Sequence, residues 1–198
     1  MIAETLEQAH IEYYKNNELS KSKDPRYKWW FELKENASYR SMIEMSAFRD
    51  LNSARFPEKN KDFRKWKRNV SILELGFGIQ CYGLINLVNK YHMNPAGIFG
   101  IEASDVAIRN ANIVAKGGTF IKTDYEYEAL LKVLDALIEK EIQFNIIMSR
   151  YFIEGFENQE EIIKRIKLLL KPINPQTLRI RGIYVQTSKG FGSQDKFI

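Results

Sequence analysis

From residue 70 onward, short apolar segments alternate with segments whose apolar residues recur at helical spacing, and this alternation restricts the fold more than any other feature. The consecutive apolar residues in the short segments predict strands that are buried on both faces. These strands cover residues 70–75, 98–101, 119–122, 144–148 and 178–185. Because strands that alternate with helices form parallel sheets, we expect a three-layer α/β sandwich around a mostly parallel central sheet.

Four amphipathic helices connect the predicted strands. Their apolar positions span residues 81–91, 104–115, 127–138 and 162–170. Ser104 is a residue type that caps helix starts, and Pro172 ends the last of these helices. Each helix lies between two strands, as the crossover connections of a parallel sheet require.

Residues 1–68 have a different organisation, with helical spacing and many aromatic side chains. We therefore divide the chain into a helical lead-in or lid, residues 1–68, and an α/β core, residues 69–198. The aromatic cluster in the lead-in either packs on the sheet or lines an acceptor pocket, and both roles are compatible. Its members are Tyr27, Trp29, Trp30 and Phe31.

Residues 58–68 are rich in lysine and arginine, with Phe63 and Trp66 between the charges. A basic stripe with stacking aromatic rings is typical of a nucleic-acid surface. The alternative is a solvated helix that turns Phe63 and Trp66 toward the core. The net charge of +5 suits an anionic partner without requiring one. A nucleic-acid partner is therefore compatible with the sequence but not required by it.

The single cysteine, Cys81, cannot form an internal disulfide, which favours a reducing compartment. The N-terminal residues lack the basic and apolar regions of a secretory signal. The longest apolar runs, at about four to six residues, are far shorter than a membrane span. We therefore expect a cytoplasmic protein that does not enter a membrane.

Polar and glycine residues follow the first three predicted strands, where ligands of parallel sheets bind. Glu74, Gly76 and Gly78 end the first strand, and the two glycines allow a tight turn and close approach of a ligand. Glu102 ends the second strand, 26 residues after Gly76. A carboxylate at this point can accept hydrogen bonds from both hydroxyls of a ribose. Asp124 ends the third strand, either as a ligand-binding residue or as a cap for the helix from residue 127.

In this order and spacing the strand ends resemble the class I S-adenosylmethionine-dependent methyltransferases, a family with a Rossmann-like fold. Glu74, Gly76 and Gly78 match the acid and alternate glycines of the family's first motif, while Gln80 replaces the usual third glycine. Asn145 replaces the aspartate that often introduces the fourth strand. Residues 168–172 resemble the family's turn before the fifth strand. The resemblance covers residues 70 to about 188.

The resemblance implies that S-adenosylmethionine (SAM) is the cofactor and that a methyl group passes to an acceptor, a small molecule or a biopolymer. In the family, the acid at Glu102 binds the ribose and the acid at Asp124 receives the adenine amino group, with Tyr125 against the adenine ring. The cofactor-binding residues that we predict are Glu74, Gly76, Gly78, Glu102, Ala103, Asp124, Tyr125 and Ser149.

The residues after the fourth strand are the candidates for a general base. Tyr151 and Glu154 are near the expected methyl group, whereas His10 belongs to an apolar helix stripe and His92 ends a helix. Residues 149–152 differ from the motif of enzymes that methylate amino groups on bases. The sequence has no cluster of carboxylates and histidines typical of a metal site, so we predict no metal.

Three expectations stay open. The chain could be an inactive SAM-binding module, with Gln80 as the symptom. It could also be a nicotinamide-dinucleotide-binding protein, although Cys81 occupies the third glycine position of the dinucleotide fingerprint.

The family usually has seven strands, and only about ten residues follow Ser188. We therefore expect the last one or two strands to be lacking. The resulting open edge favours a homodimer or a further C-terminal domain.

Overall fold

The computed structural model describes Ile43 and residues 61–79, 81–124, 126–150, 152–174, 179–180, 182–187 and 196–197. All of them belong to one compact unit, residues 42–198. Apart from Ile43, the lead-in up to residue 60 lies outside the described residues, including the aromatic cluster at Tyr27–Phe31 and His10, and so do Gln80, Tyr125 and Tyr151. The division between lead-in and core at residue 68 remains a prediction.

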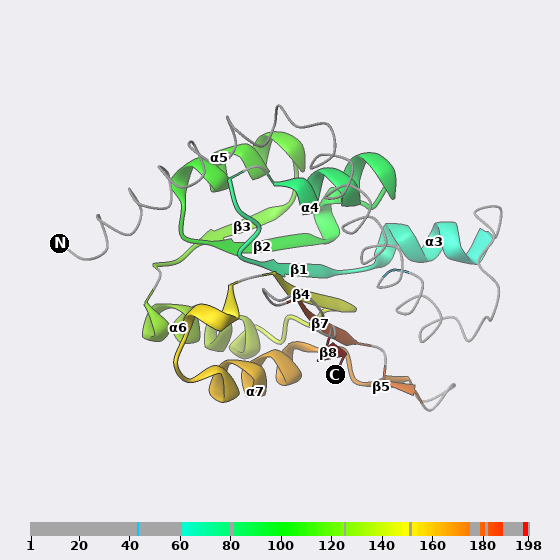
Figure 1. Cartoon of the computed structure of the whole chain (residues 1–198). Helices are drawn as coiled ribbons and strands as arrows, with labels where there is room; N and C mark the ends of the chain where they lie inside the picture. The colour runs from blue at the N-terminus through cyan, green and yellow to red at the C-terminus, as the bar shows by residue number, and fades with distance from the viewer. Residues whose placement is uncertain are drawn as a thin grey trace. The chain divides into compact units, whose positions relative to one another are not determined.

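The central sheet has six strands in the order β3-β2-β1-β4-β7-β8 (Figure 1). Five of them are parallel: β1 (Ile72–Leu75), β2 (Ile98–Glu102), β3 (Thr119–Lys122), β4 (Ile146–Arg150) and β7 (Ile183–Thr187). The sixth, β8 (Lys196–Phe197), pairs antiparallel with β7. The strand order reverses between β1 and β4, which is the point where such sheets bind ligands.

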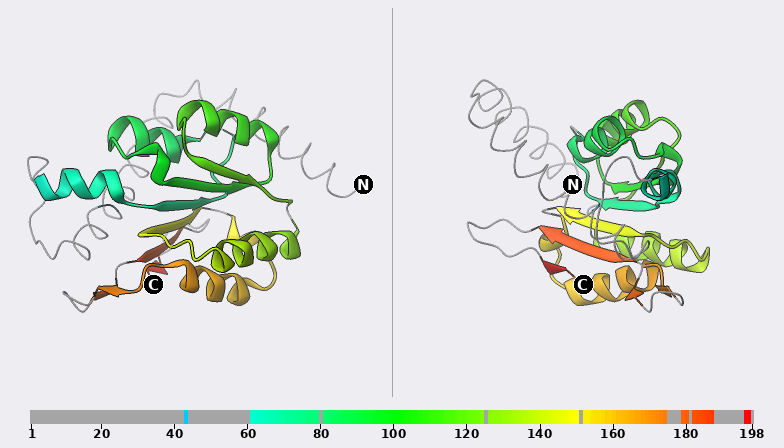
Figure 2. Two further views of the ribbon diagram at one scale, coloured as in Figure 1. Left: turned by 180° about the vertical axis from the view of Figure 1, so that it is seen from behind. Right: turned by 90° about the vertical axis from the view of Figure 1, so that its right-hand side faces the viewer.

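Helices cover both faces of this sheet (Figure 2). One face carries α4 (Tyr82–Ile85), its π-helical continuation η1 (Asn86–Lys90) and α5 (Asp105–Val114), and the other carries α6 (Tyr127–Glu139) and α7 (Gln159–Leu169). The remaining helices are α3 (Lys61–Asn69), η2 (Pro95–Gly97) and η3 (Ile153–Gly155). The predicted α/β sandwich with a Rossmann-like parallel sheet is confirmed.

The core between the sheet and the helices α6 and α7 forms because side chains alternate along the strands and recur every three or four residues along one helix face. In β1 every second residue, Leu73 and Leu75, faces these helices. Residues at spacings of four and three line the facing stripes of the two helices. These residues are Leu130, Leu134 and Leu137 in α6, and Ile162, Ile166 and Leu169 in α7. The apolar stripes that the sequence predicts are therefore the buried faces of the helices.

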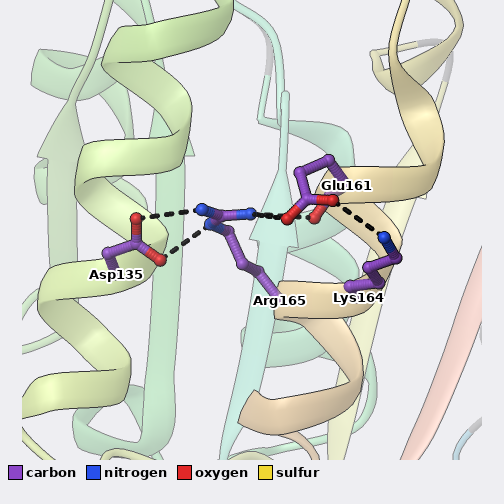
Figure 3. Close-up of polar contacts among 4 residues, drawn as sticks. All are labelled: Asp135, Glu161, Lys164 and Arg165. Carbon is purple, nitrogen blue, oxygen red and sulfur yellow. Dashed lines mark hydrogen bonds and ion pairs between the residues drawn. The ribbon is translucent and has the colours of Figure 1, made fainter.

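A polar cluster joins the outer parts of α6 and α7 (Figure 3). The Arg165 guanidinium donates to both oxygens of Asp135, with an Nε–Oδ1 distance of 2.7 Å, and to Glu161 Oε1 at 2.7 Å. Lys164 donates to the other Glu161 oxygen. Hydrogen bonds from Lys164 and Arg165 hold the pKa of Glu161 below its usual value. The bidentate pair links α6 to α7.

The fifth strand of the sheet begins later than the sequence predicts. Residues 178–185 do not form one strand: β6 (Arg179–Ile180) pairs with β5 (Ile173–Asn174) in a separate hairpin, and β7 starts at Ile183. Gly182 separates the two strands. A Cβ there would lie 2.7 Å from Leu170 Cβ and 2.8 Å from the Lys171 nitrogen. The chain therefore turns at Gly182 in close contact with the segment that follows α7.

The basic helix α3 buries Trp66, while Arg64, Lys65 and Arg68 are exposed. The buried ring agrees with the solvated-helix alternative and removes Trp66 as a stacking platform. None of the helices among the described residues has the length and apolar character that a membrane crossing requires.

Adjacent leucines at the end of α7 test the packing of this helix. Leu169 is 1% exposed and belongs to the core, whereas Leu168 is 63% exposed. We expect Leu169→Ala to lower the free energy of unfolding by about 2–5 kcal/mol, because it leaves a cavity. Leu168→Ala makes the same chemical change in the same helix, and its effect stays within about 0.5 kcal/mol. Urea denaturation measures both, and equal losses would contradict the assigned buried face.

Candidate functional site

Two buried glutamates end neighbouring strands on the same face of the sheet. Glu74 pairs with Gly100 in register, and Glu102 follows Gly100 by two residues. Because side chains alternate along a strand, both carboxylates lie on the face opposite the α6–α7 core. Glu74 is 0% and Glu102 3% exposed. The structure therefore brings together the two acids that the sequence singles out.

Backbone N–H groups from two segments surround the Glu102 carboxylate. Ala103 N donates to Oε1 at 2.8 Å, and Ser104 N donates to the same oxygen at 3.3 Å. Gly78 N donates to Oε2 at 2.8 Å. These bonds meet the requirement of a buried carboxylate for hydrogen-bond donors. They also tie the glycine loop, residues 76–81, to the end of β2.

The two loop glycines both have left-handed backbones, but they differ in how closely other residues pack on them. A Cβ on Gly76, at φ 69°, would lie 2.6 Å from the Phe152 side chain. Gly76 is therefore required by packing. At Gly78, with φ 68°, no atom of the described residues lies within 4 Å of where a Cβ would be. The described residues therefore leave room beside Gly78 but not beside Gly76.

Cys81 also has a left-handed backbone, with φ 51°, and its side chain is completely buried. Its thiol faces the carbonyl oxygens of Gly78 at 3.5 Å and Ala107 at 3.6 Å. Burial raises the pKa of this thiol to about 12, and the negative charges of Glu74 and Glu102 add to the effect. The thiol is therefore a neutral packing group between loop and helix, and is no nucleophile near pH 7.

Sequence reasoning missed several residues that shape this loop. Phe152 covers Gly76, and the Asn110 amide donates to the Ile79 carbonyl at 2.8 Å, which holds the loop against α5. Neither residue belongs to the motif. The strand-end position of Phe152 is the one sequence signal that could have indicated its role.

The end of β3 lies beside Glu102, because Thr123 N donates to the Glu102 carbonyl at 3.0 Å. Asp124 is the next residue and is exposed. The N-cap of α6 is Glu126, so the alternative role of Asp124 as the cap of this helix is wrong. Asp124 therefore remains the ligand candidate at this strand end, with its carboxylate accessible.

Ser149, at the end of β4, pairs in register with Leu75. Its side chain therefore lies on the face opposite Glu74, where it is fully buried. Within the described part of the chain the Ser149 hydroxyl has no hydrogen-bond partner, and the same holds for the Thr123 hydroxyl. A contact of Ser149 with a ligand on the Glu74 face would have to come from its backbone.

The two candidates for a general base are not tested. Glu154 belongs to η3, which follows β4, but its side chain, like all of Tyr151, lies outside the described residues. His92 lies between η1 and η2, before β2 begins, and so at the opposite edge of the sheet. Among the described residues, no group of three potential metal ligands occurs.

The burial of Cys81 predicts low reactivity toward thiol reagents. With a pKa of about 12, about one thiol in ten thousand is ionised at pH 8. We expect the folded protein to resist alkylation by iodoacetamide at pH 8 and to react fully once urea unfolds it, since the unfolded thiol has a pKa of about 8.5. Mass spectrometry after timed alkylation measures this directly, because the chain has one cysteine. Rapid modification of the folded protein would contradict the buried position.

Comparisons with known proteins give the following matches. No protein-family model matches the chain, and a search of curated proteins gave no match. Among solved structures, the plantazolicin methyltransferase BpumL in complex with S-adenosylhomocysteine (SAH) has 18% identity and a TM-score of 0.46, with 91% of this chain and 61% of that chain covered. This chain thus spans about three fifths of that protein.

Two further structures have similar values. A SAM-dependent methyltransferase from Thiobacillus denitrificans in complex with SAH has 15% identity and a TM-score of 0.40, covering 59% of this chain and 41% of that one. The sugar N-methyltransferase KedS8 from Streptoalloteichus sp. has 13% identity and a TM-score of 0.42, covering 74% and 45%.

Proposed function

We propose that this protein is a SAM-dependent methyltransferase whose acceptor is a small molecule or a biopolymer. The observation that carries the proposal is the joint position of two elements at the strand ends. The carboxylate of the buried Glu102 lies 2.8 Å from the Gly78 nitrogen, and none of the described residues fills the position of a Cβ on Gly78. An acid and an accessible glycine loop at the switch point of a parallel sheet form a site for a nucleoside ligand.

The residues fit the nucleoside half of SAM. Glu102 supplies acceptors for ribose hydroxyl groups. The exposed Asp124, which follows the β3 residue bonded to Glu102, can accept from the adenine amino group. In this proposal Ala103 borders the ribose, and Tyr125 lies against the adenine ring.

The residues also fit the methionine half. A sulfonium and an ammonium group are cations, and the buried Glu74 and Glu102 provide negative charge on the same face of the sheet. In this proposal the backbone of Gly76, Gly78 and Ser149 borders the methionine end. When bound, SAM supplies a methyl group on a positively charged sulfur, and the protein orients the acceptor toward it. Tyr151 and Glu154 stay the proposed general bases for acceptors that must lose a proton.

The alternative of a nicotinamide-dinucleotide protein is not favoured by the packing of Cys81. The loop has left-handed residues at 76, 78 and 81, which is the spacing of the dinucleotide fingerprint. The third glycine of that fingerprint allows close packing of helix and strand. Here a buried thiol fills that place against the Ala107 carbonyl. The alternative of an inactive SAM-binding module differs from our proposal only in turnover.

The cytoplasmic location belongs to the same proposal and depends on the lone cysteine. A nucleic-acid partner, a homodimer and a further C-terminal domain stay predictions from the sequence.

Titration with SAM and SAH tests the proposal. We expect each ligand to raise the melting temperature, because a ligand at 100 times its Kd stabilises the folded state by about 2.7 kcal/mol. Glu102→Ala should weaken binding at least about tenfold, which corresponds to about 1.4 kcal/mol. Glu139→Ala, at the exposed end of α6, is the control and should bind normally. Absence of binding by the folded wild-type protein would rule out the proposed cofactor.

Two glycines with matching backbones separate ligand binding from folding. Gly78 and Gly117 both have left-handed φ values, 68° and 99°, and both have room for a Cβ. We expect Gly78→Ala and Gly117→Ala each to lower the free energy of unfolding by about 1–2 kcal/mol through backbone strain. Only Gly78→Ala should abolish SAH binding, because its methyl group enters the proposed ligand space. Calorimetry measures binding and urea denaturation measures stability; normal SAH binding by Gly78→Ala would move the ligand away from this loop.

A further inference from the structure

One helix accounts for most of the positive charge of the chain. The nine residues of α3 include five lysines or arginines and one aspartate, which give it a net charge of +4. The whole chain has a net charge of +5, so the other 189 of its 198 residues sum to only +1. A charge excess that is confined to one short segment marks the place where an anionic partner is attracted most strongly.

The exposed side of α3 carries this charge. Arg64, Lys65 and Arg68 are exposed, whereas Trp66 is 7% exposed and Val70, just after the helix, 2%. Residues three and four positions apart are neighbours on a helix surface, so Arg68 lies next to both Arg64 and Lys65. These three cations form one patch, which we call the basic face of α3. The apolar side chains at Trp66 and Val70 hold the helix to the rest of the protein.

Helix stability does not account for the basic face. Like charges four residues apart, as at Arg64 and Arg68, destabilise a helix. The helix macrodipole favours a cation in the last turn, where Arg68 lies, but gives no such advantage to Lys65 in the middle of α3. In α7 the charges are arranged in the opposite way, because Glu161 forms an ion pair with Arg165 one turn later. An anionic partner would give the like charges of α3 the favourable contact that the helix itself does not provide.

The basic face is separate from the candidate site. Helix α3 ends at Asn69, and β1 begins at Ile72 (Figure 1). The Arg68 carbonyl accepts a hydrogen bond from the Asn94 amide at 3.2 Å, shortly before β2 begins at Ile98. Helix α3 is therefore attached where these two strands start, whereas the candidate site lies where they end. A partner on the basic face would be bound at a surface distinct from the candidate site.

The chemistry of the basic face favours a nucleic acid over a membrane surface. A helix that lies on a membrane buries apolar side chains among the lipids. In α3 the Trp66 ring is buried in the protein instead, and the exposed side chains that the structure describes in this helix are all polar or charged. Contacts with the phosphates of a nucleic acid require only such cations.

We infer that the basic face of α3 binds the phosphate backbone of a nucleic acid, without regard to base sequence. This inference goes beyond the proposed function and does not depend on the cofactor. The contact differs from the stacking surface considered from the sequence, because the buried Trp66 ring is not accessible to a base. The basic face is a docking surface rather than the place where an acceptor is methylated, since it lies beside the strand starts.

The salt dependence of binding tests the inference. We would measure the Kd of the full chain for a short fluorescein-labelled DNA duplex by anisotropy, between about 50 and 200 mM salt. Each cation that contacts a phosphate contributes about 0.9 to the steepness of log K against the logarithm of the salt concentration. Lys65→Gln combined with Arg68→Gln should therefore reduce this steepness by about 2. Over the same range of salt, the affinity of the wild-type protein should fall roughly tenfold more than that of the variant.

A matched control removes the same charge elsewhere. Arg109→Gln combined with Lys132→Gln replaces one exposed arginine in α5 and one exposed lysine in α6. We expect this variant to keep the salt dependence of the wild-type protein, and both variants to unfold at the urea concentration of the wild type. Equal losses of salt dependence in the two variants would show that net charge, rather than α3, attracts the duplex, and would overturn the inference.

Two further measurements examine the kind of partner. Two duplexes of unrelated sequence should bind within about threefold of each other, because phosphate contacts carry no sequence information. No binding of the duplex at about 50 mM salt would overturn the inference, and so would tighter binding to phosphatidylserine vesicles than to the duplex. SAM binding is measured without nucleic acid, so failure of this inference and failure of the proposed function are seen separately.

Discussion

The hydrogen bonds that the Glu102 carboxylate accepts from backbone N–H groups are the interaction on which the geometry of the site depends. A buried carboxylate is tolerated only where donors surround it, and here the donors belong to two segments, at Gly78 and at Ala103 and Ser104. Backbone N–H groups cannot rotate away as side chains do, so the loop and the turn hold each other. The sheet also holds the start of the glycine loop, because Gly76 N, just after the end of β1, donates to the Ile101 carbonyl of β2.

Aromatic rings packed against glycines determine where the site is closed and where it is open. A Cβ on Gly100 would lie 2.6 Å from the Phe77 ring, and Phe77 meets Phe120 edge to face with centroids 5.6 Å apart. Phe152 covers Gly76 in the same way. Gly76 and Gly100 are therefore sites of close packing, whereas no described residue packs on Gly78. Gly76 and Gly78 look equivalent in the motif, but among the described residues a side chain is excluded by packing only at Gly76.

The sequence predicts the sheet well because the buried strands, such as β1 and β2, consist mostly of apolar residues. The shared face of Glu74 and Glu102 also follows from the alternation of side chains. The fifth strand was predicted to begin too early because apolar residues occur on both sides of Gly182, and the close contact of Gly182 with Leu170 and Lys171 is visible only in the structure. The partners of Glu102 could not be predicted, because backbone N–H groups leave no signature in the sequence.

The negative charge of this site bears on the kind of ligand that suits it. Glu74 and Glu102 both raise the pKa of the Cys81 thiol, so the charges of both carboxylates reach the glycine loop. Two like charges buried on one face repel each other, and the N–H groups that bond to Glu102 stabilise its charge without removing it. A cationic ligand would offset part of this charge. Within the proposed function, the sulfonium and ammonium groups of SAM supply that positive charge, whereas a nicotinamide dinucleotide would bring the negative charge of its pyrophosphate toward the same loop. The field around Glu74 and Glu102 therefore favours the methyltransferase over the dinucleotide alternative on grounds independent of the glycine spacing.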